Sequence, residues 1–140
     1  MGYRAATIDE LGDGFMRKVR EPLGVTAFGV NALVLPAGTE WFNHRHERQD
    51  ELYVVQRGRA GFDVDGETFE LGPGGLCHVE AATARQVWNA GEDELVLVII
   101  GGKDGYVGRD GQLVDPDDLE RRIAAGKNDP EAVKRREPRS

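Results

Sequence analysis

The hydrophobic positions of this chain fall into short runs of β-strand length, and each run ends at or beside Gly, Pro, Asp or Asn. In several runs apolar and polar residues alternate with a period of two, which is typical of strands buried on one face. The runs are VTAFGVNALVL (25–35), ELYVVQ (51–56), AGFDVD (60–65), ETFEL (67–71), LCHVE (76–80), RQVWN (85–89) and ELVLVII (94–100). Asp65-Gly66, between two of the runs, is a strong hairpin signal. This pattern predicts an all-β sandwich or barrel.

Helical patterns are confined to the two ends of the chain. We expect a weak turn at residues 8–11 and a helix at residues 116–125, within the segment DPDDLERRIAAG. Asp115 can cap this helix, Pro116 suits its first position, and Gly126 lies just past its end. The residues between these ends are expected to form about eight or more antiparallel strands in two sheets.

The length of 140 residues is that of one domain with one hydrophobic core. We predict an N-terminal arm at residues 1–24 that packs on the barrel, the barrel itself at residues 25–101, and a C-terminal extension at residues 102–140. The last fourteen residues, KNDPEAVKRREPRS, contain five basic residues and few apolar ones. Such a segment buries too little surface to offset the entropy lost on ordering. We therefore predict that the tail is frayed.

The charge of the chain bears on its partners. The formal net charge is −7, so the overall field does not attract a nucleic acid or an anionic membrane. The single cysteine, Cys77, cannot form an internal disulfide, and the first ten residues lack the apolar run of a signal peptide. We expect a cytoplasmic protein with a small-molecule ligand, no nucleic-acid partner and no membrane partner.

Candidate chemistry is concentrated in the stretch GTEWFNHRHERQDELYVVQRG. Side chains alternate across a strand, so His44 and His46 point to the same face. Glu51 begins the next strand, and a hairpin partner can bring its carboxylate beside the imidazoles. Two histidines and one carboxylate on a common face suit iron, manganese, nickel or zinc and leave coordination positions open for a substrate. We expect the polar atoms of these three side chains to lie within about 5 Å of one another inside the barrel.

The spacing Gly38-x5-His44-x-His46-x4-Glu51-x6-Gly58 resembles the first motif of the cupin superfamily, with every signature residue present. The resemblance covers about residues 25–101. It implies a double-stranded β-helix, which is a jelly-roll barrel with the site inside, and it implies a homodimer. It also implies that His44, His46 and Glu51 are metal ligands.

The second cupin motif is degenerate in this chain. Where the family has a third metal-binding histidine, the sequence GGLCHVEAATARQVWN places Arg85. A guanidinium has no lone pair to donate and does not lose its proton in proteins. At about 5 Å from a divalent ion and an effective dielectric near 20, its repulsion is on the order of 6 to 7 kcal/mol. Arginine and metal therefore compete for the centre of the site.

Three arrangements remain open. Arg85 can form a bidentate pair with Glu51 in a metal-free pocket. It can instead stand beside a metal held by three ligands and bind an anionic group of the substrate. In the third arrangement His78 takes the place of the missing histidine. Besides Arg85, we expect Tyr53 and Trp41 to contact the ligand, because such sites are largely lined by apolar and aromatic side chains.

The arginine favours a small cupin whose inward pocket binds a small anionic molecule without requiring a metal. The alternative is a metal-dependent cupin enzyme of dioxygenase, isomerase or decarboxylase type, because the fold does not choose among these reactions.

Overall fold

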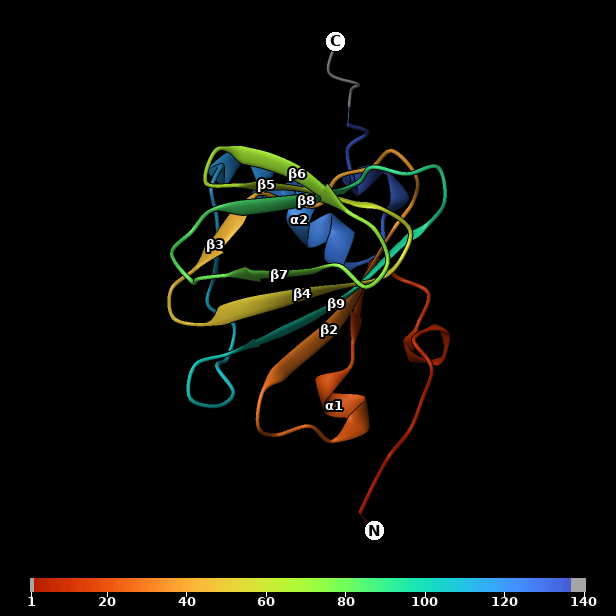
Figure 1. Cartoon of the computed structure of the whole chain (residues 1–140), viewed down its shortest axis with the longest axis vertical. Coiled ribbons are helices and arrows are strands. Elements are labelled where there is room, and N and C mark those ends of the chain that lie inside the picture. Colours follow the sequence, from red (N-terminus) through yellow and green to blue (C-terminus); the bar gives the residue numbers. More distant parts are fainter. Residues whose placement is uncertain (1, 137–140) are drawn as a thin grey trace.

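Two five-stranded antiparallel sheets make up the body of the protein (Figure 1). The computed structural model describes residues 2–136. The first sheet has the order β1 (Met16–Lys18), β2 (Gly29–Leu35), β9 (Leu95–Gly102), β4 (Asp50–Arg57) and β7 (Leu76–Val79). The second has the order β10 (Gly111–Leu113), β3 (His44–His46), β8 (Arg85–Asn89), β5 (Ala60–Val64) and β6 (Glu67–Leu71).

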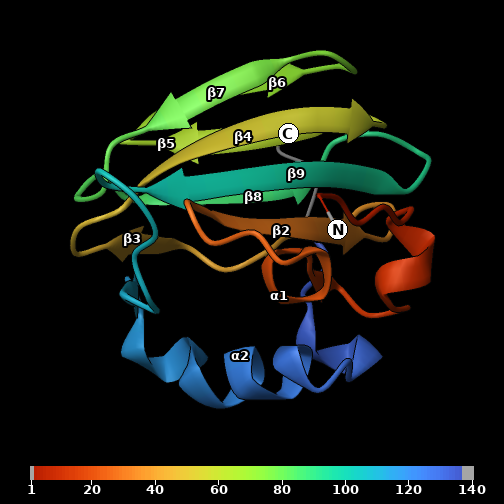
Figure 2. The ribbon, with the colours of Figure 1, turned by 90° about the horizontal axis from the view of Figure 1, so that it is seen from below.

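The two sheets face each other, and α2 (Leu119–Gly126) runs beneath β2 and β3 (Figure 2). This is the all-β double-stranded β-helix that the sequence predicts. Among residues 2–136 the strands form two separate sheets rather than one closed barrel. No helix in the described part of the chain is long and apolar enough to cross a membrane.

The core lies between the sheets and is supplied by the alternating positions of their strands. On β4, Tyr53 and Val55 are each 1% exposed, while the residues between and after them are more exposed. Leu95 and Leu97 on β9 and Phe62 on β5 are fully buried in the same cluster. Burying one such large apolar side chain stabilises the fold by about 1.5 to 3 kcal/mol. Glu51 shares the face of Tyr53 and is thereby directed to one end of this interior.

The predicted hairpin at Asp65-Gly66 is confirmed. Strands β5 and β6 pair in register from Val64 opposite Glu67 to Ala60 opposite Leu71. Asp65 and Gly66 both have positive φ, 49° and 83°. Positive φ at both central residues is the signature of a type I′ turn, whose twist matches that of the flanking strands.

Several short elements near the chain ends differ from the sequence prediction. The turn near residues 8–11 is present as η1 (Asp9–Leu11), and the C-terminal helix begins with a 3₁₀ turn, η2 (Pro116–Asp118), before α2. Asp115 accepts a hydrogen bond from the backbone N–H of Asp117, which is the expected cap. The helix α1 (Arg20–Leu23) and the strands β1 and β10 were not predicted, because three or four residues are too few to show a period.

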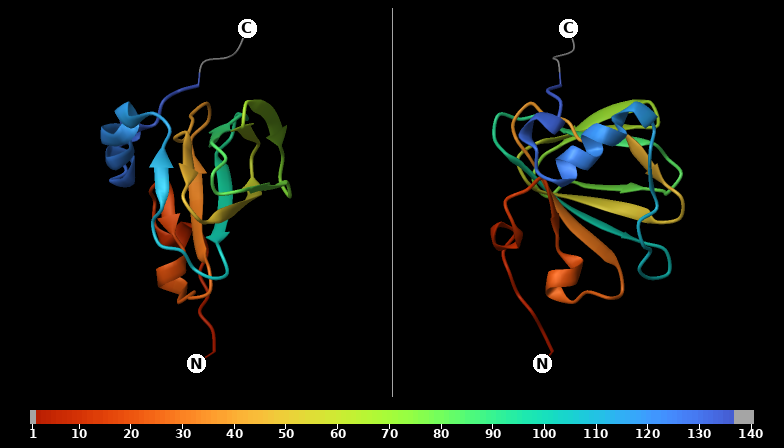
Figure 3. Two further views of the ribbon diagram at one scale, coloured as in Figure 1. Left: turned by 90° about the vertical axis from the view of Figure 1, so that its left-hand side faces the viewer. Right: turned by 180° about the vertical axis from the view of Figure 1, so that it is seen from behind.

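The prediction of a frayed tail is wrong for residues 132–136, which pack against the sheets at the end of the turn η3 (Pro130–Ala132). Val133 is 7% exposed, and the carbonyl of Lys134 accepts a hydrogen bond from Glu40 N–H at 2.9 Å. The Arg136 guanidinium lies 3.6 Å from the centre of the Trp88 ring. These contacts join the tail to residues far away in the sequence, so the composition of the tail alone could not reveal them. Residues 137–140 lie outside the described part. The two ends of the described chain leave the body in opposite directions (Figure 3).

Candidate functional site

His44, His46 and Glu51 converge between the two sheets. His44 and His46 lie on β3, and Glu51 lies at the start of β4. Their candidate ligand atoms are all within 4.8 Å of one another, which confirms the predicted convergence. Glu51 Oε1 is 3.0 Å from His46 Nε2 and 3.6 Å from His44 Nε2.

The route by which Glu51 reaches the histidines differs from the predicted hairpin. Strand β3 pairs with β8 and β10, whereas β4 pairs with β7 and β9. The prediction that β3 and β4 are hydrogen-bonded partners is therefore wrong. The turn at residues 47–49 carries the chain from one sheet to the other, so the carboxylate faces the imidazoles across the interior.

Each imidazole is oriented by a hydrogen bond at its Nδ1 atom. His44 Nδ1 lies 2.9 Å from the carbonyl oxygen of Phe42, and His46 Nδ1 lies 2.7 Å from Asp110 Oδ1. A carbonyl or carboxylate oxygen can only accept, so each Nδ1 carries the proton. In the neutral rings the lone pair is then on Nε2, the atom that faces Glu51. A hydrogen bond that fixes one ring nitrogen so that the other can bind is typical of metal-ligating histidines.

Asp110 is a site residue that the sequence analysis missed. Its Oδ2 accepts hydrogen bonds from the backbone N–H groups of Arg48 at 2.7 Å and Gln49 at 3.0 Å. Its Oδ1 accepts from the Gln49 side chain at 2.6 Å as well as from His46. Burial alone raises the pKa of Asp110, but these hydrogen bonds outweigh burial and hold the pKa well below its usual range. Asp110 is 64 positions from His46, and no local pattern links the two.

Arg85 lies directly opposite His44 in the β3–β8 pair and has no exposed surface. Its Nη1 donates to Glu51 Oε1 at 3.1 Å. Its Nη2 donates to the carbonyl oxygens of Glu80 at 2.7 Å and Ala81 at 3.4 Å. The predicted inward orientation and the pairing with Glu51 are present, but the pair is not bidentate. The backbone carbonyls before β8 hold the other side of the guanidinium.

Glu51 Oε1 also accepts a hydrogen bond from the Tyr53 hydroxyl at 2.9 Å. Burial raises the pKa of Glu51, but the adjacent His44 and His46 imidazoles lower it well below its usual range. Burial and the nearby Glu51 charge raise the pKa of Tyr53 well above its ordinary value, so Tyr53 remains a donor. Burial lowers the pKa of His46, but its contacts with Glu51 and Asp110 raise it overall.

Two buried nitrogens in this cluster lack a hydrogen-bond partner, His46 Nε2 and Arg85 Nε. His46 Nε2 has no hydrogen bond, although it lies 3.0 Å from Glu51 Oε1. Buried polar atoms are nearly always satisfied, so such an atom calls for a ligand or an ion. The donor set of two imidazole nitrogens and one carboxylate oxygen therefore fits a divalent transition metal. The positive charge of Arg85 beside Glu51 is the one feature that opposes a cation.

Two other predicted site residues lie elsewhere. The Trp41 ring packs against Phe15 and Phe42, with the Arg122 guanidinium 4.9 Å from its centre, so it belongs to the packing between the sheets and α2. The prediction that Trp41 contacts the ligand is therefore not supported. His78 is exposed on β7, where alternation directs Val79 inward and His78 outward. The third arrangement, with His78 as a ligand, is wrong.

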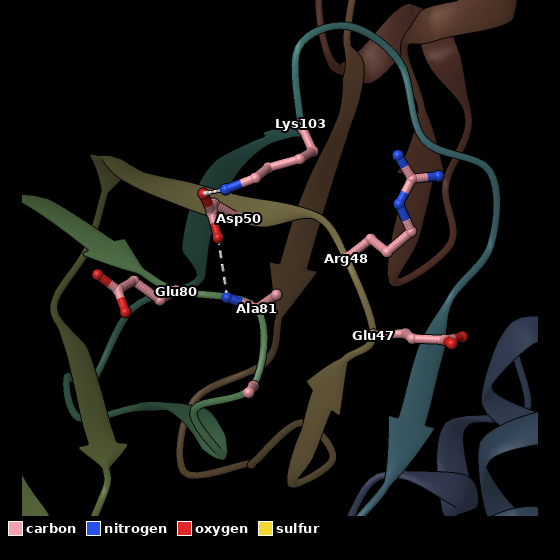
Figure 4. Close-up of a pocket in the computed structure, with 7 residues that line it drawn as sticks. Glu47, Arg48, Asp50, Glu80, Ala81 and Lys103 are labelled. Carbon is pink, nitrogen blue, oxygen red and sulfur yellow. Dashed lines mark hydrogen bonds and ion pairs between the residues drawn. The ribbon is translucent and has the colours of Figure 1, made fainter.

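A separate hollow of about 480 Å³ is lined by Glu47, Arg48, Asp50, Glu80, Ala81, Ala82 and Lys103 (Figure 4). Within this lining, the backbone N–H of Ala81 donates to Asp50 Oδ1 at 3.0 Å. Lys103 lies 3.5 Å from the other oxygen of Asp50. Ala81 also presents its carbonyl oxygen to His46 N–H and to Arg85. Ala81 therefore contacts both the hollow and the buried cluster.

The sequence and the fold both match known proteins. Residues 32–101, half of the chain, match the model of the cupin domain family. The chain belongs to the cupin family. A cupin protein from Bacteroides fragilis superposes with a TM-score of 0.64 at 24% identity, covering 74% of this chain and 86% of the other. A sugar phosphate isomerase of the cupin superfamily from Silicibacter pomeroyi superposes with a TM-score of 0.63 at 19% identity, covering 71% and 76%.

Among curated proteins, this cupin is 37% identical over 70 residues to an uncharacterised protein of Streptomyces coelicolor, which is 50% of this chain and 66% of that protein. The chain spans about half to two thirds of the length of the curated relatives that it matches, with 52% and 66% covered. These likenesses establish the family and the fold. The chemistry has to be argued from the site.

Proposed function

We propose that this cupin binds a divalent metal ion through His44, His46 and Glu51, and that Arg85 holds a small anionic molecule beside it. The observation that carries the proposal is the buried His46 Nε2, which has no hydrogen bond and faces Glu51 Oε1 at 3.0 Å. With both Nδ1 atoms committed to acceptors, the two Nε2 lone pairs and the carboxylate are the available donors.

The charge of the cluster favours a cation as the first ligand. Glu51 and Asp110 are both held ionised, and Arg85 supplies one positive charge. With neutral imidazoles the balance is one net negative charge in a cluster whose side chains are at most 20% exposed. An anion added alone would raise this to two negative charges, which is costly in a region of low dielectric. A divalent cation changes the balance to one positive charge, which an anionic ligand then neutralises.

The roles of the residues follow from this balance. His44, His46 and Glu51 would hold the metal, and an ion of this kind supplies Lewis acidity toward a bound oxygen atom. Arg85 is fixed by Glu80 O and Glu51, so its position costs no further ordering when a ligand arrives. Tyr53 donates to Glu51 and keeps the carboxylate in place.

A second candidate is metal-free binding of an anion. The observation that favours it is the ion pair at 3.1 Å between Arg85 Nη1 and Glu51 Oε1, in which a guanidinium serves as the cation of the cluster. The sequence alone favoured this function, because it revealed Arg85 but not the second carboxylate, Asp110.

Metal titration tests the first proposal. Chelator-treated protein is titrated calorimetrically with Mn²⁺, Ni²⁺, Zn²⁺ and, without oxygen, Fe²⁺. We expect saturable binding of one ion per chain, and at least a tenfold loss of affinity, about 1.4 kcal/mol, in His46→Gln. His78→Gln is the matched control, because this histidine is exposed on β7 and should be replaceable without effect. Absence of saturable binding, or equal losses in both variants, would refute the proposal.

Anion titration separates the two candidates. Phosphate, oxalate and glucose 6-phosphate are titrated into metal-free and metal-loaded protein, the last because one structural neighbour is described as a sugar phosphate isomerase. The metal-dependent function predicts binding only to the loaded protein. Equal binding to both forms would favour the metal-free function.

A further inference from the structure

Asp110 connects the candidate site to a part of the chain outside the family's matched region. The family model covers residues 32–101, whereas Asp110 immediately precedes β10. Its side chain is only 9% exposed. Strand β10 extends the sheet by pairing with β3, with Gly111 opposite His46. This pairing brings the carboxylate of Asp110 beside Nδ1 of the His46 ring, the ring nitrogen that does not face Glu51.

Four donors share the two oxygens of Asp110. Oδ1 accepts hydrogen bonds from His46 Nδ1 and from the side chain of Gln49. Oδ2 accepts hydrogen bonds from the backbone N–H groups of Arg48 and Gln49. The backbone of Asp110 adds a hydrogen bond from Glu47 N–H to its carbonyl at 3.1 Å. Asp110 is therefore hydrogen-bonded both to His46 and to the turn that leads from β3 to β4.

We propose that Asp110 is the positioning residue of this site, holding the His46 ring with Nδ1–H toward Asp110 and Nε2 toward Glu51, and fixing the turn that sets His46 relative to Glu51. His46 and Glu51 belong to different sheets, so no strand pairing sets the distance between them. The turn at residues 47–49 does, and the Asp110 carboxylate closes that turn. The consequence for metal affinity rests on the proposed function, whereas the form of the imidazole does not.

Asparagine at this position makes the inference testable, because an amide has one acceptor oxygen where the carboxylate has two. The backbone N–H groups of Arg48 and Gln49 cannot turn away, so the amide oxygen will face them. The NH₂ group then faces His46 Nδ1 and donates to it, which forces the ring proton onto Nε2. A carboxylate retained in Asp110→Glu keeps two acceptors and should keep the original form.

The experiment is a long-range ¹H–¹⁵N correlation spectrum of metal-free, ¹⁵N-labelled protein, which reports directly which ring nitrogen carries the proton. It is recorded over a series of increasing alkaline pH values, because Glu51 and Asp110 raise the pKa of His46 and only the neutral ring carries its proton on a single nitrogen. We expect Nδ1–H for His46 in the parent and in Asp110→Glu, and Nε2–H in Asp110→Asn. Asp115→Asn is the matched control, because Asp115 also accepts a backbone N–H in the same extension but caps η2 away from the site.

Calorimetric titration of the same proteins with Zn²⁺ gives the second readout. An outer-shell partner of a metal-binding histidine typically contributes about 10- to 100-fold in affinity, so Asp110→Asn should lose that much and Asp115→Asn should lose none. An Nε2–H ring in the parent, or an unchanged ring in Asp110→Asn, would overturn the positioning role. Because the parent spectrum alone can decide, an unstable variant does not leave the inference open. If the ring proton moves to Nε2 in Asp110→Asn but neither the parent nor any variant binds Zn²⁺, the positioning role of Asp110 is upheld and the proposed metal function is refuted.

Discussion

Arg85 on β8 and Glu51 on β4 form an ion pair across the interior of the protein, with Nη1 3.1 Å from Oε1. The guanidinium has no exposed surface and the carboxylate side chain is 12% exposed. Each belongs to a different sheet, so the pair joins the two halves of the fold at the end of the core where the histidines lie.

Replacing Arg85 with alanine should destabilise the protein strongly. Removing one partner of a buried ion pair typically costs about 3 to 5 kcal/mol, since it leaves the other charge uncompensated. Here the loss should be near the lower limit, because the Tyr53 hydroxyl still donates to Glu51 Oε1. Urea unfolding measures it. Arg59→Ala is the control, since Arg59 pairs with Glu70 at the surface and exposed pairs contribute about 0 to 1 kcal/mol. Equal losses in the two variants would contradict the structural importance of the buried pair.

Replacing Arg85 with histidine should increase metal affinity. The new imidazole would stand beside His44 in the β3–β8 pair and supply the third histidine that the second motif lacks. We expect Ni²⁺ or Zn²⁺ to bind at least tenfold more tightly than to the parent, about 1.4 kcal/mol, in calorimetric titration. Arg85→Gln removes the charge without adding an imidazole, so it separates the relief of repulsion from the gain of a ligand. If Arg85→His and the parent bind equally, residue 85 does not reach the metal.

The parts of the site that sequence alone revealed are those fixed by local geometry. Strand alternation places His44 and His46 on one face, and the same alternation directs Glu51 and Tyr53 inward on β4. Arg85 emerged from its place in a degenerate motif. Each of these inferences needs only a few neighbouring residues, and each agrees with the contacts that the structure contains.

The rest of the site depends on contacts between distant segments. Asp110 reaches His46 only because β10 pairs with β3, and a strand of three residues carries no readable period. Trp41 lies outside the strands, so alternation could not tell which way it points. Val133 and Arg136 order the tail through single contacts in a segment whose composition suggests disorder. The expected homodimer and cytoplasmic location stay predictions.

Tyr53→Phe should destabilise the protein without disturbing the core. The change keeps the ring, which packs edge-on against Phe62 with centroids 5.7 Å apart, and removes the hydrogen bond to Glu51. A hydrogen bond to a charged group contributes about 1.5 to 3 kcal/mol, so we expect a loss of that order in urea unfolding. Tyr106→Phe is the matched control, because the Tyr106 side chain is 45% exposed. If Tyr53→Phe has the same free energy of unfolding as the parent, water replaces the hydroxyl at Glu51 without loss of stability.

Gly61→Ala should both destabilise the fold and loosen the C-terminal tail. Gly61 lies opposite Trp88 in the β5–β8 pair, and a Cβ on Gly61 would collide with the indole ring. The Arg136 guanidinium also lies over the Trp88 ring, so moving the indole displaces the C-terminal end of the described chain. Overpacking of this kind costs about 1 to 3 kcal/mol, which urea unfolding measures.

Hydrogen exchange then tests the link between Gly61 and the tail. The Arg136 N–H donates to the carbonyl of Gly38 at 2.8 Å, and we expect it to exchange faster in Gly61→Ala than in the parent. Gly108→Ala is the control, because a Cβ there meets nothing within 4 Å. Slow exchange at Arg136 despite a destabilised Gly61→Ala protein would show that Val133 and the backbone bonds hold the tail without Trp88. Faster exchange confined to Gly61→Ala would identify the indole as the anchor, since a charged segment orders only where a specific surface offsets its entropy.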